Sequence, residues 1–523
     1  INLHKIIIKQ KINIAGYDLK NICKLFLEYG LPVNNNTLDL FDYKVINGIL
    51  AKDENIYKIF FTYFKSDVKE IDNIVFEKTN LFESELNDEQ IYNLSSFADY
   101  YKKLKHELLI KLNETNQFQI YENIEKVLLP MIITMEYNGI KTDVDYLKKL
   151  NSTLEIKLDE LMKKIYNDAG ENEFNINSPK QLGEILFGKM QLPAQRKTKT
   201  GFSTDIESLE KIKFLHPIIE KILEYRKFGK IKNTYIEPFI QHTGKNNKIH
   251  TVFNQTGTST GRFSSVNPNL QNLPNSSEDE INIRKSFIVE NEANIFVGAD
   301  YSQIELRIIA HLADDEYMIK SFKNNEDIHN STAVKIFGLK DLNSVSSDMR
   351  RLAKTINFGV LYGMTAHSLS EETGLYYNQA KTFIENYFKN FSNIKKYFDD
   401  LISEASKTGF VSTLYGRRRQ IPELNSKNKN ILQSGIRMAM NMPVQGTAAD
   451  ILKMAMLKIN NILDSFSAKC LLTIHDELIF ELPEIYSEKF IIEIKNIMEN
   501  IAVLKTPLKV SICTGKTLSD LKH

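Results

Sequence analysis

The sequence predicts a mixed α/β protein of several domains, and three observations lead to this expectation. At 523 residues the chain is too long for one hydrophobic core, so we expect three or more subdomains. Residues 1–118 alternate short β-like runs with helical patterns, which is typical of a small α/β domain. From residue 119 to about 242 the pattern turns helical, which predicts a separate helical region.

The expected elements follow in chain order. A β-like run covers 5–8, and helical patterns cover 18–29 and 90–112. Long amphipathic segments then predict helices over 143–166 and 217–239.

Composition indicates a soluble globular protein. Hydrophobic residues make up 42% and charged residues 25%, and no apolar run approaches the length of a membrane span. Cys23, Cys470 and Cys513 lack metal-ligand spacing, so we expect reduced thiols and a cytoplasmic location. The first residue is Ile, which predicts a fragment of a longer protein. With a net charge of +1, any site for a polyanion must be locally basic.

Two stretches suit contact with nucleic acid. Residues 225–232 hold four basic residues and no acid, a pattern that fits a phosphate backbone or, alternatively, a solvated helix face. Residues 254–275 contain no acid and many small residues, and they offer the donors of Arg262, Gln271 and Asn272. Such donors reach the acceptors that every base pair presents in the minor groove, although a plain connector is the alternative.

Carboxylates follow two predicted strands. The buried-strand pattern 294–300 ends in Asp300 and precedes a helical pattern over 303–312. In 471–482, two apolar β runs flank His475, Asp476 and Glu477, which we expect at the tip of a tight hairpin. Asp300 and Asp476 on rigid strands suit Mg²⁺, which prefers oxygen ligands and substrate phosphates, although an Asp-Glu pair is more often only a turn.

A stripe of four side chains marks residues 350–363. Arg350, Lys354, Phe358 and Tyr362 are four apart, so on a helix each lies about 40° round from the last, over about 18 Å. The two cations suit a polyphosphate, and the two rings suit a sugar and base. A basic surface helix with core aromatics explains the same pattern, so the stripe alone leaves both interpretations open.

Together these stretches resemble the family A DNA polymerases, in particular the large fragments of the bacterial enzymes. The resemblance covers about 119–523 and keeps the family's order. The matching motifs are 260–265 (Thr-Gly-Arg-Phe-Ser-Ser), 300–307 (Asp-Tyr-Ser-Gln-Ile-Glu-Leu-Arg), 327–329 (Asp-Ile-His), 350–363, 441–450 (Asn-Met-Pro-Val-Gln-Gly-Thr-Ala-Ala-Asp) and 475–477 (His-Asp-Glu).

The resemblance implies a right-hand polymerase with an N-terminal RNase H-like domain of the 3′–5′ exonuclease type. The implied boundaries are 1–118 for the exonuclease-like domain, 119–245 for the thumb, 246–312 and 427–523 for the palm, and 313–426 for the fingers.

The resemblance also implies a role for each matched residue. Asp300 and Asp476 are expected to hold two metal ions with the Tyr301 carbonyl, while Glu477 supports the site. Lys354 is the candidate general acid, Glu305 the steric gate against ribose, and Tyr362 the ring at the template side. The nucleotide-binding set is Arg350, Lys354, Phe358, Tyr362, His329, Glu305 and Gln303. The DNA-binding set is Arg262, Gln271, Asn272, Arg437, Asn441, Gln445 and His475.

The implied activity is template-directed DNA synthesis at a primer 3′-OH. Its expected cofactor is a pair of Mg²⁺ ions, for which Mn²⁺ substitutes. The expected partners are a primer-template duplex and dNTPs, and we expect a monomer near the bacterial nucleoid.

The N-terminal domain departs from the family pattern. No Asp in 1–118 is followed two positions later by Glu, and Ile22 stands where the second exonuclease motif has its aspartate. Around Ser95 to Asp99 the expected Tyr-x-x-x-Asp is also absent. We therefore expect an inactive domain and no proofreading.

Two other functions fit part of the sequence pattern. A single-subunit RNA polymerase shares the palm carboxylates, but Glu305 as a steric gate excludes ribonucleotides. A catalytically silent DNA-binding scaffold is disfavoured by Asp300, Asp476 and Lys354.

Overall fold

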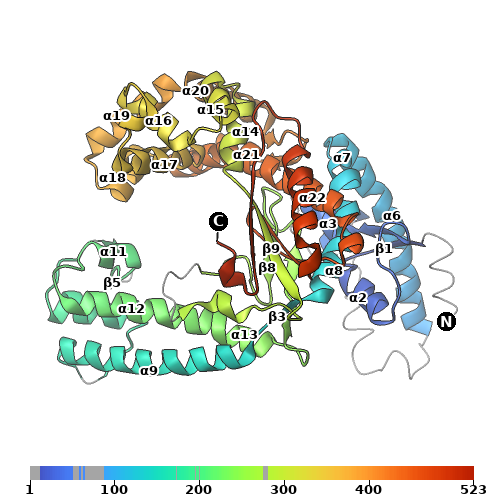
Figure 1. Cartoon of the computed structure of the whole chain (residues 1–523), viewed down its shortest axis with the longest axis horizontal. Helices are drawn as coiled ribbons and strands as arrows, with labels where there is room; N and C mark the ends of the chain where they lie inside the picture. Colours follow the sequence, from blue (N-terminus) through green and yellow to red (C-terminus); the bar gives the residue numbers. More distant parts are fainter. Residues whose placement is uncertain are drawn as a thin grey trace.

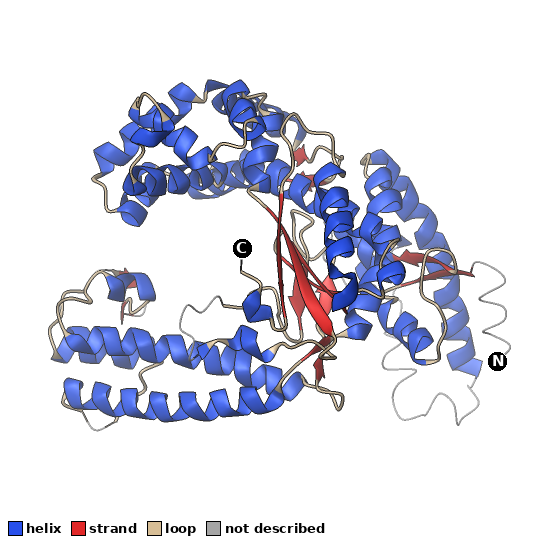
Figure 2. Ribbon diagram, in the orientation of Figure 1, coloured by secondary structure: helices blue, strands red, loops and turns tan. Residues whose placement is uncertain are grey.

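A central sheet surrounded by helical lobes organises the protein (Figures 1 and 2). The computed structural model describes residues 12–50, 58–59, 63–64, 88–171, 173–194, 196–198, 201–274 and 281–522. In Figure 1 a helical lobe lies above the sheet, a helical arm lies at the lower left, and the N-terminal elements lie on the right. The predicted mixed α/β, multidomain fold class is confirmed.

The central sheet has the strand order β12-β13-β9-β14, and all neighbours are antiparallel. Its strands are β9 (Asn294–Tyr301), β12 (Lys469–Ile474), β13 (Glu477–Pro483) and β14 (Val510–Gly515). In the middle of β9 every residue from Phe296 to Ala299 is buried, because helices and neighbouring strands cover both faces. The acid that ends this apolar run is therefore held on a rigid support.

Four helices pack around the sheet. They are α8 (Lys126–Asn138), α14 (Ile304–Leu312), α21 (Lys429–Asn460) and α22 (Ser487–Asn500). α22 packs on β9 and β14, α8 packs on β12, and α21 contacts α8, α14 and α22. The helix expected over 303–312 is confirmed as α14, and Gln303 precedes it with a φ of 55°.

The upper lobe, residues 316–408, contains six α-helices, four of which begin at side-chain caps. Asp315, Asp327, Ser346 and Thr365 each accept a backbone N–H of the following helix, which satisfies a donor that the helix leaves free. The helices are α15 (Glu316–Lys323), α16 (Ile328–Phe337), α17 (Ser347–Leu361), α18 (Ala366–Thr373), α19 (Tyr377–Asn390) and α20 (Ser392–Thr408).

The arm, residues 144–242, is built on two long antiparallel helices, as the sequence predicts (Figure 1). α9 (Val144–Ala169) packs along α12 (Pro217–Ile231), and η3 (Lys232–Ile236) and α13 (Glu237–His242) continue α12. Its outer end holds α10 (Pro179–Gly183), η2 (Glu184–Lys189) and α11 (Ile206–Glu210).

The basic segment 225–232 differs from its expected role at two positions. The Arg226 guanidinium donates to the backbone carbonyls of Thr204 and Ile176, so it holds the end of the arm together. Lys232 forms ion pairs of 2.7 Å with Glu237 and 3.3 Å with Glu155. The sequence shows four basic residues on one segment, but the fold shows that Arg226 and Lys232 already bind groups within the arm.

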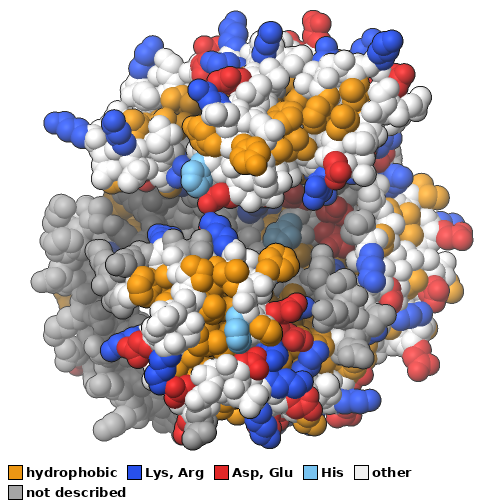
Figure 3. Space-filling view, turned by 90° about the vertical axis from the view of Figure 1, so that its left-hand side faces the viewer, with side chains coloured by type: hydrophobic (Ala, Val, Ile, Leu, Met, Phe, Trp, Pro, Cys, Tyr) orange, Lys and Arg blue, Asp and Glu red, His pale blue; other side chains and the backbone are white. Residues whose placement is uncertain are grey.

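An ion pair joins the arm to the upper lobe. Lys211 Nζ lies 3.4 Å from Glu371 Oε1, across the open side of the molecule. Figure 3 looks into this side and shows a hollow between the two lobes, with Lys, Arg and His side chains along it. Both side chains are well exposed to water, so the pair adds little stability and leaves the two lobes free to separate.

The N-terminal elements form a small α/β unit. β1 (Ile12–Gly16) pairs in parallel with β2 (Leu38–Asp42), beside α2 (Lys20–Glu28), α3 (Tyr43–Ile49) and α6 (Asp88–Glu114). The helices expected over 18–29 and 90–112 are confirmed as α2 and α6, whereas the run 5–8 lies outside the described residues. Ile22, at the exonuclease position, is half exposed on α2.

This unit is attached to α8 by a buried carboxylate. Glu136 on α8 lies 2.6 Å from Lys20 Nζ and 2.5 Å from Lys24 Nζ, and it also accepts the Phe253 backbone N–H at 2.7 Å. Both lysines belong to α2, so one side chain joins the N-terminal unit to the sheet region.

Short elements complete the chain. They are α7 (Phe118–Ile120), η1 (Tyr121–Glu125), β3 (Ile140–Lys141), β4 (Lys197–Thr198), β5 (Gly201–Phe202), β6 (Lys248–Ile249), β7 (Val252–Asn254), β8 (Ser264–Val266), η5 (Ile283–Ser286), η6 (Leu342–Ser344), β10 (Phe410–Ser412), β11 (Arg418–Gln420), η7 (Pro422–Asn425), η8 (Asp464–Phe466), η9 (Glu484–Tyr486) and η10 (Leu518–Asp520). None of the helices in the described part of the chain has the length and apolarity needed to cross a bilayer.

Candidate functional site

The two candidate metal-binding aspartates lie at one end of the central sheet. Asp300 is the penultimate residue of β9, and it pairs with Glu477 on the neighbouring strand. Tyr301 donates its backbone N–H to the Asp476 carbonyl at 3.4 Å. Strand pairing therefore places Asp300 beside the turn that carries Asp476, and both side chains are partly exposed.

The hairpin tip is shorter than expected. β12 ends at Ile474 and β13 begins at Glu477, so only His475 and Asp476 form the turn. His475 has a φ of 56°, as a tight two-residue hairpin requires. Glu477 is a buried strand residue, and its carboxylate lies 4.0 Å from the Arg284 guanidinium. The expectation that Glu477 caps the tip was wrong, because strand pairing with β9 extends one residue further.

Arg262 connects Asp476 with the candidate steric gate. Its guanidinium donates to Glu305 Oε1 at 2.6 Å and to Asp476 Oδ1 at 3.2 Å. Burial opposes the charge of Arg262, but the two carboxylates outweigh burial and raise its pKa. For Glu305, burial and the charge of Asp476 raise the pKa, while Arg262 lowers it. Arg262 therefore balances two carboxylates that would otherwise repel each other.

The four-residue stripe lies on α17, as the sequence predicts. The helix ends at Leu361, so Tyr362 stands one residue beyond it. The Tyr362 hydroxyl donates to Glu305 Oε2 at 2.9 Å, which links the end of the stripe to Arg262. Burial, with the Glu305 charge, raises the pKa of Tyr362 to about 12, so this hydroxyl keeps its proton at neutral pH.

The two cations of the stripe have different surroundings. Arg350 pairs with Asp327 at 2.7 Å, and Asp327 is also the cap of α16. Burial alone would raise the pKa of Asp327, but the hydrogen bond from Arg350 lowers it. Lys354 is exposed one turn further on. The helix therefore presents one paired guanidinium and one exposed ammonium.

His329 and Phe358 pack against each other between α16 and α17, and His329 is almost fully buried. Their ring centroids are 5.7 Å apart, and the two rings are tilted. His329 Nε2 lies 3.4 Å from the amide nitrogen of Gln303, three residues after Asp300. Burial, assisted by the charges of Arg350 and Lys354, lowers the pKa of His329 to about 4 against the influence of Asp327. The imidazole is therefore neutral at physiological pH.

The candidate DNA-binding residues line the same region from α21 and the hairpin. Arg437, Asn441 and Gln445 are four apart on α21, so they share one face of that helix. Gln271 donates to the Thr473 carbonyl at 3.3 Å, beside the hairpin, whereas Asn272 is exposed. His475 is exposed at the tip.

The donor set suits a cation that brings part of its own coordination shell. Within the described residues, no group of three or more His, Cys, Asp or Glu side chains is placed to hold a metal ion. The strand carboxylate of Asp300, the turn carboxylate of Asp476 and the nearby Tyr301 carbonyl remain. Such a set fits Mg²⁺, which commonly completes its octahedron with water and substrate phosphates.

Comparison with known proteins decides the family. The model of DNA polymerase family A matches residues 144–520, well over half of the chain. This chain belongs to DNA polymerase family A. The match includes both aspartates, the whole of α17 and the residues of α21 named above.

Curated relatives of family A agree with this assignment. DNA polymerase I of Bacillus subtilis (strain 168) is 44% identical over 425 residues, which is 80% of this chain and 48% of that protein. DNA polymerase I of Caldicellulosiruptor bescii is 40% identical over 515 residues, 97% of this chain and 57% of that protein. The chain thus spans about half the length of the curated relatives it matches.

A solved family A structure shares the fold. The POL domain of Pol1 from M. smegmatis, in complex with DNA primer-template and dNTP, superimposes with a TM-score of 0.87 and 29% identity. The similarity covers 97% of this chain and 86% of that one. The right-hand polymerase fold is therefore confirmed, while the individual domain boundaries stay predictions.

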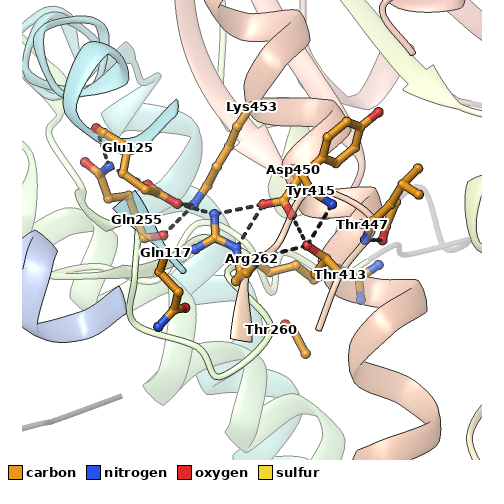
Figure 4. Close-up of polar contacts among 12 residues, drawn as sticks. Gln117, Glu125, Gln255, Thr260, Arg262, Thr413, Tyr415, Thr447, Asp450 and Lys453 are labelled. Atoms are coloured by element: carbon orange, nitrogen blue, oxygen red, sulfur yellow. Dashed lines mark hydrogen bonds and ion pairs between the residues drawn. The ribbon is translucent and has the colours of Figure 1, made fainter. Parts of the chain in front are cut away.

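One buried cluster escaped the sequence analysis. Glu125, Arg417, Asp450 and Lys453 form a group of charges with almost no exposure, shown in Figure 4. Lys453 Nζ lies 2.6 Å from Glu125, and Arg417 bonds to both Glu125 and Asp450, the latter at 2.8 Å. Burial lowers the pKa of Lys453 to about 8, although Glu125 opposes the shift.

This cluster supports the loop that carries Arg262. A Cβ on Gly261 would lie 2.5 Å from the Arg417 side chain, and Gly261 has a φ of 80°. Only glycine fits both constraints, which explains its place before Arg262. The run of three arginines at 417–419 was a visible signal, but the carboxylates that pair with Arg417 come from distant parts of the chain.

Proposed function

We propose that this chain carries out template-directed DNA synthesis, adding deoxynucleotides to a primer 3′-OH with release of pyrophosphate. The observation that carries the proposal is the placement of Asp300 and Asp476 side by side at one end of the sheet. Hydrogen bonds through Arg262 and Glu305 link Asp476 to Tyr362 at the end of α17. Membership of family A supports this assignment of the chemistry.

Asp300 and Asp476 hold the metal ions, together with the Tyr301 carbonyl. The ions are two Mg²⁺, with Mn²⁺ as a substitute, because the site offers hard oxygen donors only. When bound, the ions activate the attacking hydroxyl and stabilise the leaving pyrophosphate. Tyr301 is held in place by its hydroxyl, which donates to the Met498 carbonyl at 2.9 Å.

The incoming dNTP lies along α17. Arg350, Lys354 and His329 bind its phosphates, and Lys354 is the general acid that gives a proton to the departing pyrophosphate. Gln303 borders the same phosphates. Lys354 suits this role because it is exposed and no carboxylate pairs with it in the described part of the chain.

The sugar and the template contact the other end of the stripe. Phe358 lies beside the sugar, and Glu305 fills the space that a 2′-hydroxyl would need. Glu305 is fixed from two sides by Arg262 and Tyr362, so it resists displacement by ribose. This geometry favours a DNA polymerase over a single-subunit RNA polymerase, and extension with dNTPs but not rNTPs tests that choice.

A primer-template duplex occupies the hollow, contacted by neutral and basic donors. The set is Arg262, Gln271, Asn272, Arg437, Asn441, Gln445 and His475, and Glu477 supports the sheet below them. These donors match minor-groove acceptors common to all base pairs, so they test pair geometry without reading sequence. The protein acts as a monomer in the bacterial cytoplasm, near the nucleoid.

The domains follow the right hand. The exonuclease-like domain is 1–118, the thumb 119–245, the palm 246–312 and 427–523, and the fingers 313–426. Within the first of these, the half-exposed Ile22 stands where an exonuclease needs an aspartate. The domain therefore serves packing and lacks proofreading.

Primer extension by Asp300→Asn tests the proposal. The variant keeps the shape of the side chain but loses a charged ligand, so we expect extension to fall by at least about 1,000-fold while duplex binding, measured by fluorescence anisotropy, is unchanged. Asp314→Asn, an exposed carboxylate in the turn after α14, is the matched control and should extend normally. Extension by Asp300→Asn at the rate of the unaltered protein would refute the metal assignment.

A further inference from the structure

Asn357 lies at the centre of a buried hydrogen-bond group behind the phosphate-binding face. It is on α17, between Lys354 and Phe358, but it points toward α16 and has no exposed surface. Its amide nitrogen lies 3.1 Å from His329 Nδ1 and 3.0 Å from Thr332 Oγ1. Its amide oxygen accepts from the same Thr332 hydroxyl at 3.1 Å.

A neutral imidazole has one donor nitrogen and one acceptor nitrogen, so the contact with Asn357 fixes which is which. If the amide NH₂ faces His329, Nδ1 accepts and the ring proton is on Nε2. If the amide oxygen faces His329, the proton is on Nδ1. Thr332 fits both arrangements because a hydroxyl donates and accepts. The contacts within the group therefore leave two states, and the function of the ring must select one.

His329 Nε2 is the nitrogen that faces the nucleotide side. It lies 3.4 Å from the side-chain amide of Gln303, which follows the strand of Asp300, while Nδ1 faces the buried amide of Asn357. A protonated Nε2 requires the Gln303 amide to turn so that its oxygen, and not its nitrogen, faces the ring. Phosphate oxygens only accept hydrogen bonds, so a ring that binds them must carry its proton on Nε2. The opposite tautomer would direct a lone pair at the phosphates.

We propose that Asn357 is a positioning residue, which donates to His329 Nδ1 and thereby holds the ring proton on Nε2. The proposal rests on the proposed function, because only phosphate binding gives Nε2 its role as a donor. His329 is then a neutral donor whose hydrogen bond to the triphosphate does not depend on protonation of the ring.

The surroundings of His329 favour such a neutral donor. The charged groups that act on the ring are Asp327, which precedes α16, and Arg350 and Lys354 on α17. Two of the three are cations that also bind phosphate, so a third positive charge would compete with them for the same solvent-excluded space. Burial keeps the ring uncharged, and the amide of Asn357 keeps its single proton on Nε2, where it can be donated to phosphate.

The first test observes the tautomer directly, without any activity. Nitrogen-15 NMR of the DNA-free protein labelled at histidine resolves the two ring nitrogens, and His329→Gln identifies the signals among the ten histidines. We expect an unprotonated Nδ1 and a protonated Nε2 between pH 6 and 8. The reversed pattern, or a doubly protonated ring at pH 7, would overturn the proposal even if the protein synthesises DNA.

The second test replaces the hydrogen-bond donor beside His329 Nδ1 with an acceptor. In Asn357→Asp the carboxylate accepts from Nδ1–H, so a neutral ring must turn its lone pair toward the phosphates, while a charged ring keeps a proton on Nε2. We expect the KM for dNTP, relative to the unaltered protein at the same pH, to rise about ten-fold from pH 6 to 9, the cost of one lost hydrogen bond to a charged group. The kcat should change much less.

The control adds His329→Gln to Asn357→Asp, which should abolish this dependence on pH. A KM ratio that stays constant from pH 6 to 9 in the single variant would refute the role of Asn357. If Asn357→Asp fails to fold, as judged by circular dichroism, the NMR pattern of the unaltered protein decides the question. Absence of extension by the unaltered protein would instead refute the proposed function.

Discussion

At the scale of single residues, the proposed function assigns discrimination of the nucleotide sugar to a few side chains. Phe358 lies in the stripe between Lys354 and Tyr362, and its ring has no group that donates near the 3′ position. A dNTP that lacks its 3′-hydroxyl therefore loses a contact that this side chain does not replace. The neighbouring His329 ring is held by its contact with Asn357, so a hydroxyl added to Phe358 should leave its neighbours in place.

We predict that Phe358→Tyr increases the incorporation of dideoxynucleotides relative to dNTPs by about ten-fold or more, because the new hydroxyl supplies a hydrogen bond. Competitive primer extension measures the ratio. Phe388→Tyr, on α19, adds the same hydroxyl outside the stripe and should leave the ratio as it is. Equal ratios for both variants would rule out the role of Phe358 at the sugar.

His329 also makes stability depend on pH. Its pKa is about 4 in the folded protein and about 6.5 when unfolded, so the unfolded chain binds the extra proton. Stability is fully present above the unfolded value and falls as the pH drops toward 4. At pH 5 the loss is about 2 kcal/mol. Thermal unfolding at pH 7.5 and 5 should show a smaller loss in His329→Gln, with the exposed His242→Gln as the control; identical losses in all three proteins would contradict this.

Sequence patterns located single residues well and their partners poorly. Asp300 lies at the end of its strand, Asp476 lies at the hairpin turn, and three of the four residues of the stripe lie on α17, because each pattern is local. The bonds of Glu305 to Tyr362, of Arg350 to Asp327 and of His329 to Asn357 join different elements. Such bonds depend on how helices pack, and neither periodicity nor a motif encodes that packing.

At the scale of elements, α2 and α8 are joined by charge as well as by apolar contact. Glu136 is fully buried between Lys20, which is nearly buried, and Lys24, whose side chain is 23% exposed, so Glu136 and Lys20 left water when the elements packed. Their attraction must offset that loss, so removing one charge leaves the others buried without compensation. The prediction of α2 from its pattern was correct, but its attachment to α8 needed the fold.

We predict that Glu136→Gln lowers the free energy of unfolding by about 3 kcal/mol, because two ammonium groups lose their carboxylate. Thermal and urea unfolding followed by circular dichroism measure the change. Asp99→Asn breaks an exposed ion pair with Lys103 on α6 and should scarcely alter stability. Similar effects of the two substitutions would show that burial of Glu136 does not matter.

At the scale of the whole molecule, the N-terminal unit is predicted to lack the residues for hydrolysis, yet it packs closely on the rest of the protein. Its described part packs on α8 and contributes Lys20 to the Phe253 carbonyl at 2.7 Å, so it supports the sheet region. The sequence predicted the loss of function here from Ile22, and the fold supplies the structural role. The segment from 65 to 87, in contrast, lies outside the described residues.

We predict that a labelled primer with a mismatched 3′ end stays full length when the protein is incubated with Mg²⁺ and no dNTPs. An exonuclease needs its own paired carboxylates to hold metal. Here Ile22 stands where the second motif has its aspartate, and the Tyr-x-x-x-Asp pattern is absent around Ser95 to Asp99. Denaturing electrophoresis measures the primer length. Addition of dNTPs with a matched primer is the positive control, and metal-dependent shortening that persists through purification would contradict the prediction.

The buried charges of Figure 4 limit how such a protein is recombined. Glu125 and Lys453 are 328 positions apart in the chain, yet they share one hydrogen bond. A chimaera that joins the first half of one relative to the second half of another separates Glu125 from Arg417, Asp450 and Lys453. If the donors differ at any of these positions, the hybrid inherits an unbalanced charge in its centre. Crossover points in a library of hybrids should therefore be chosen so that the four residues come from one parent.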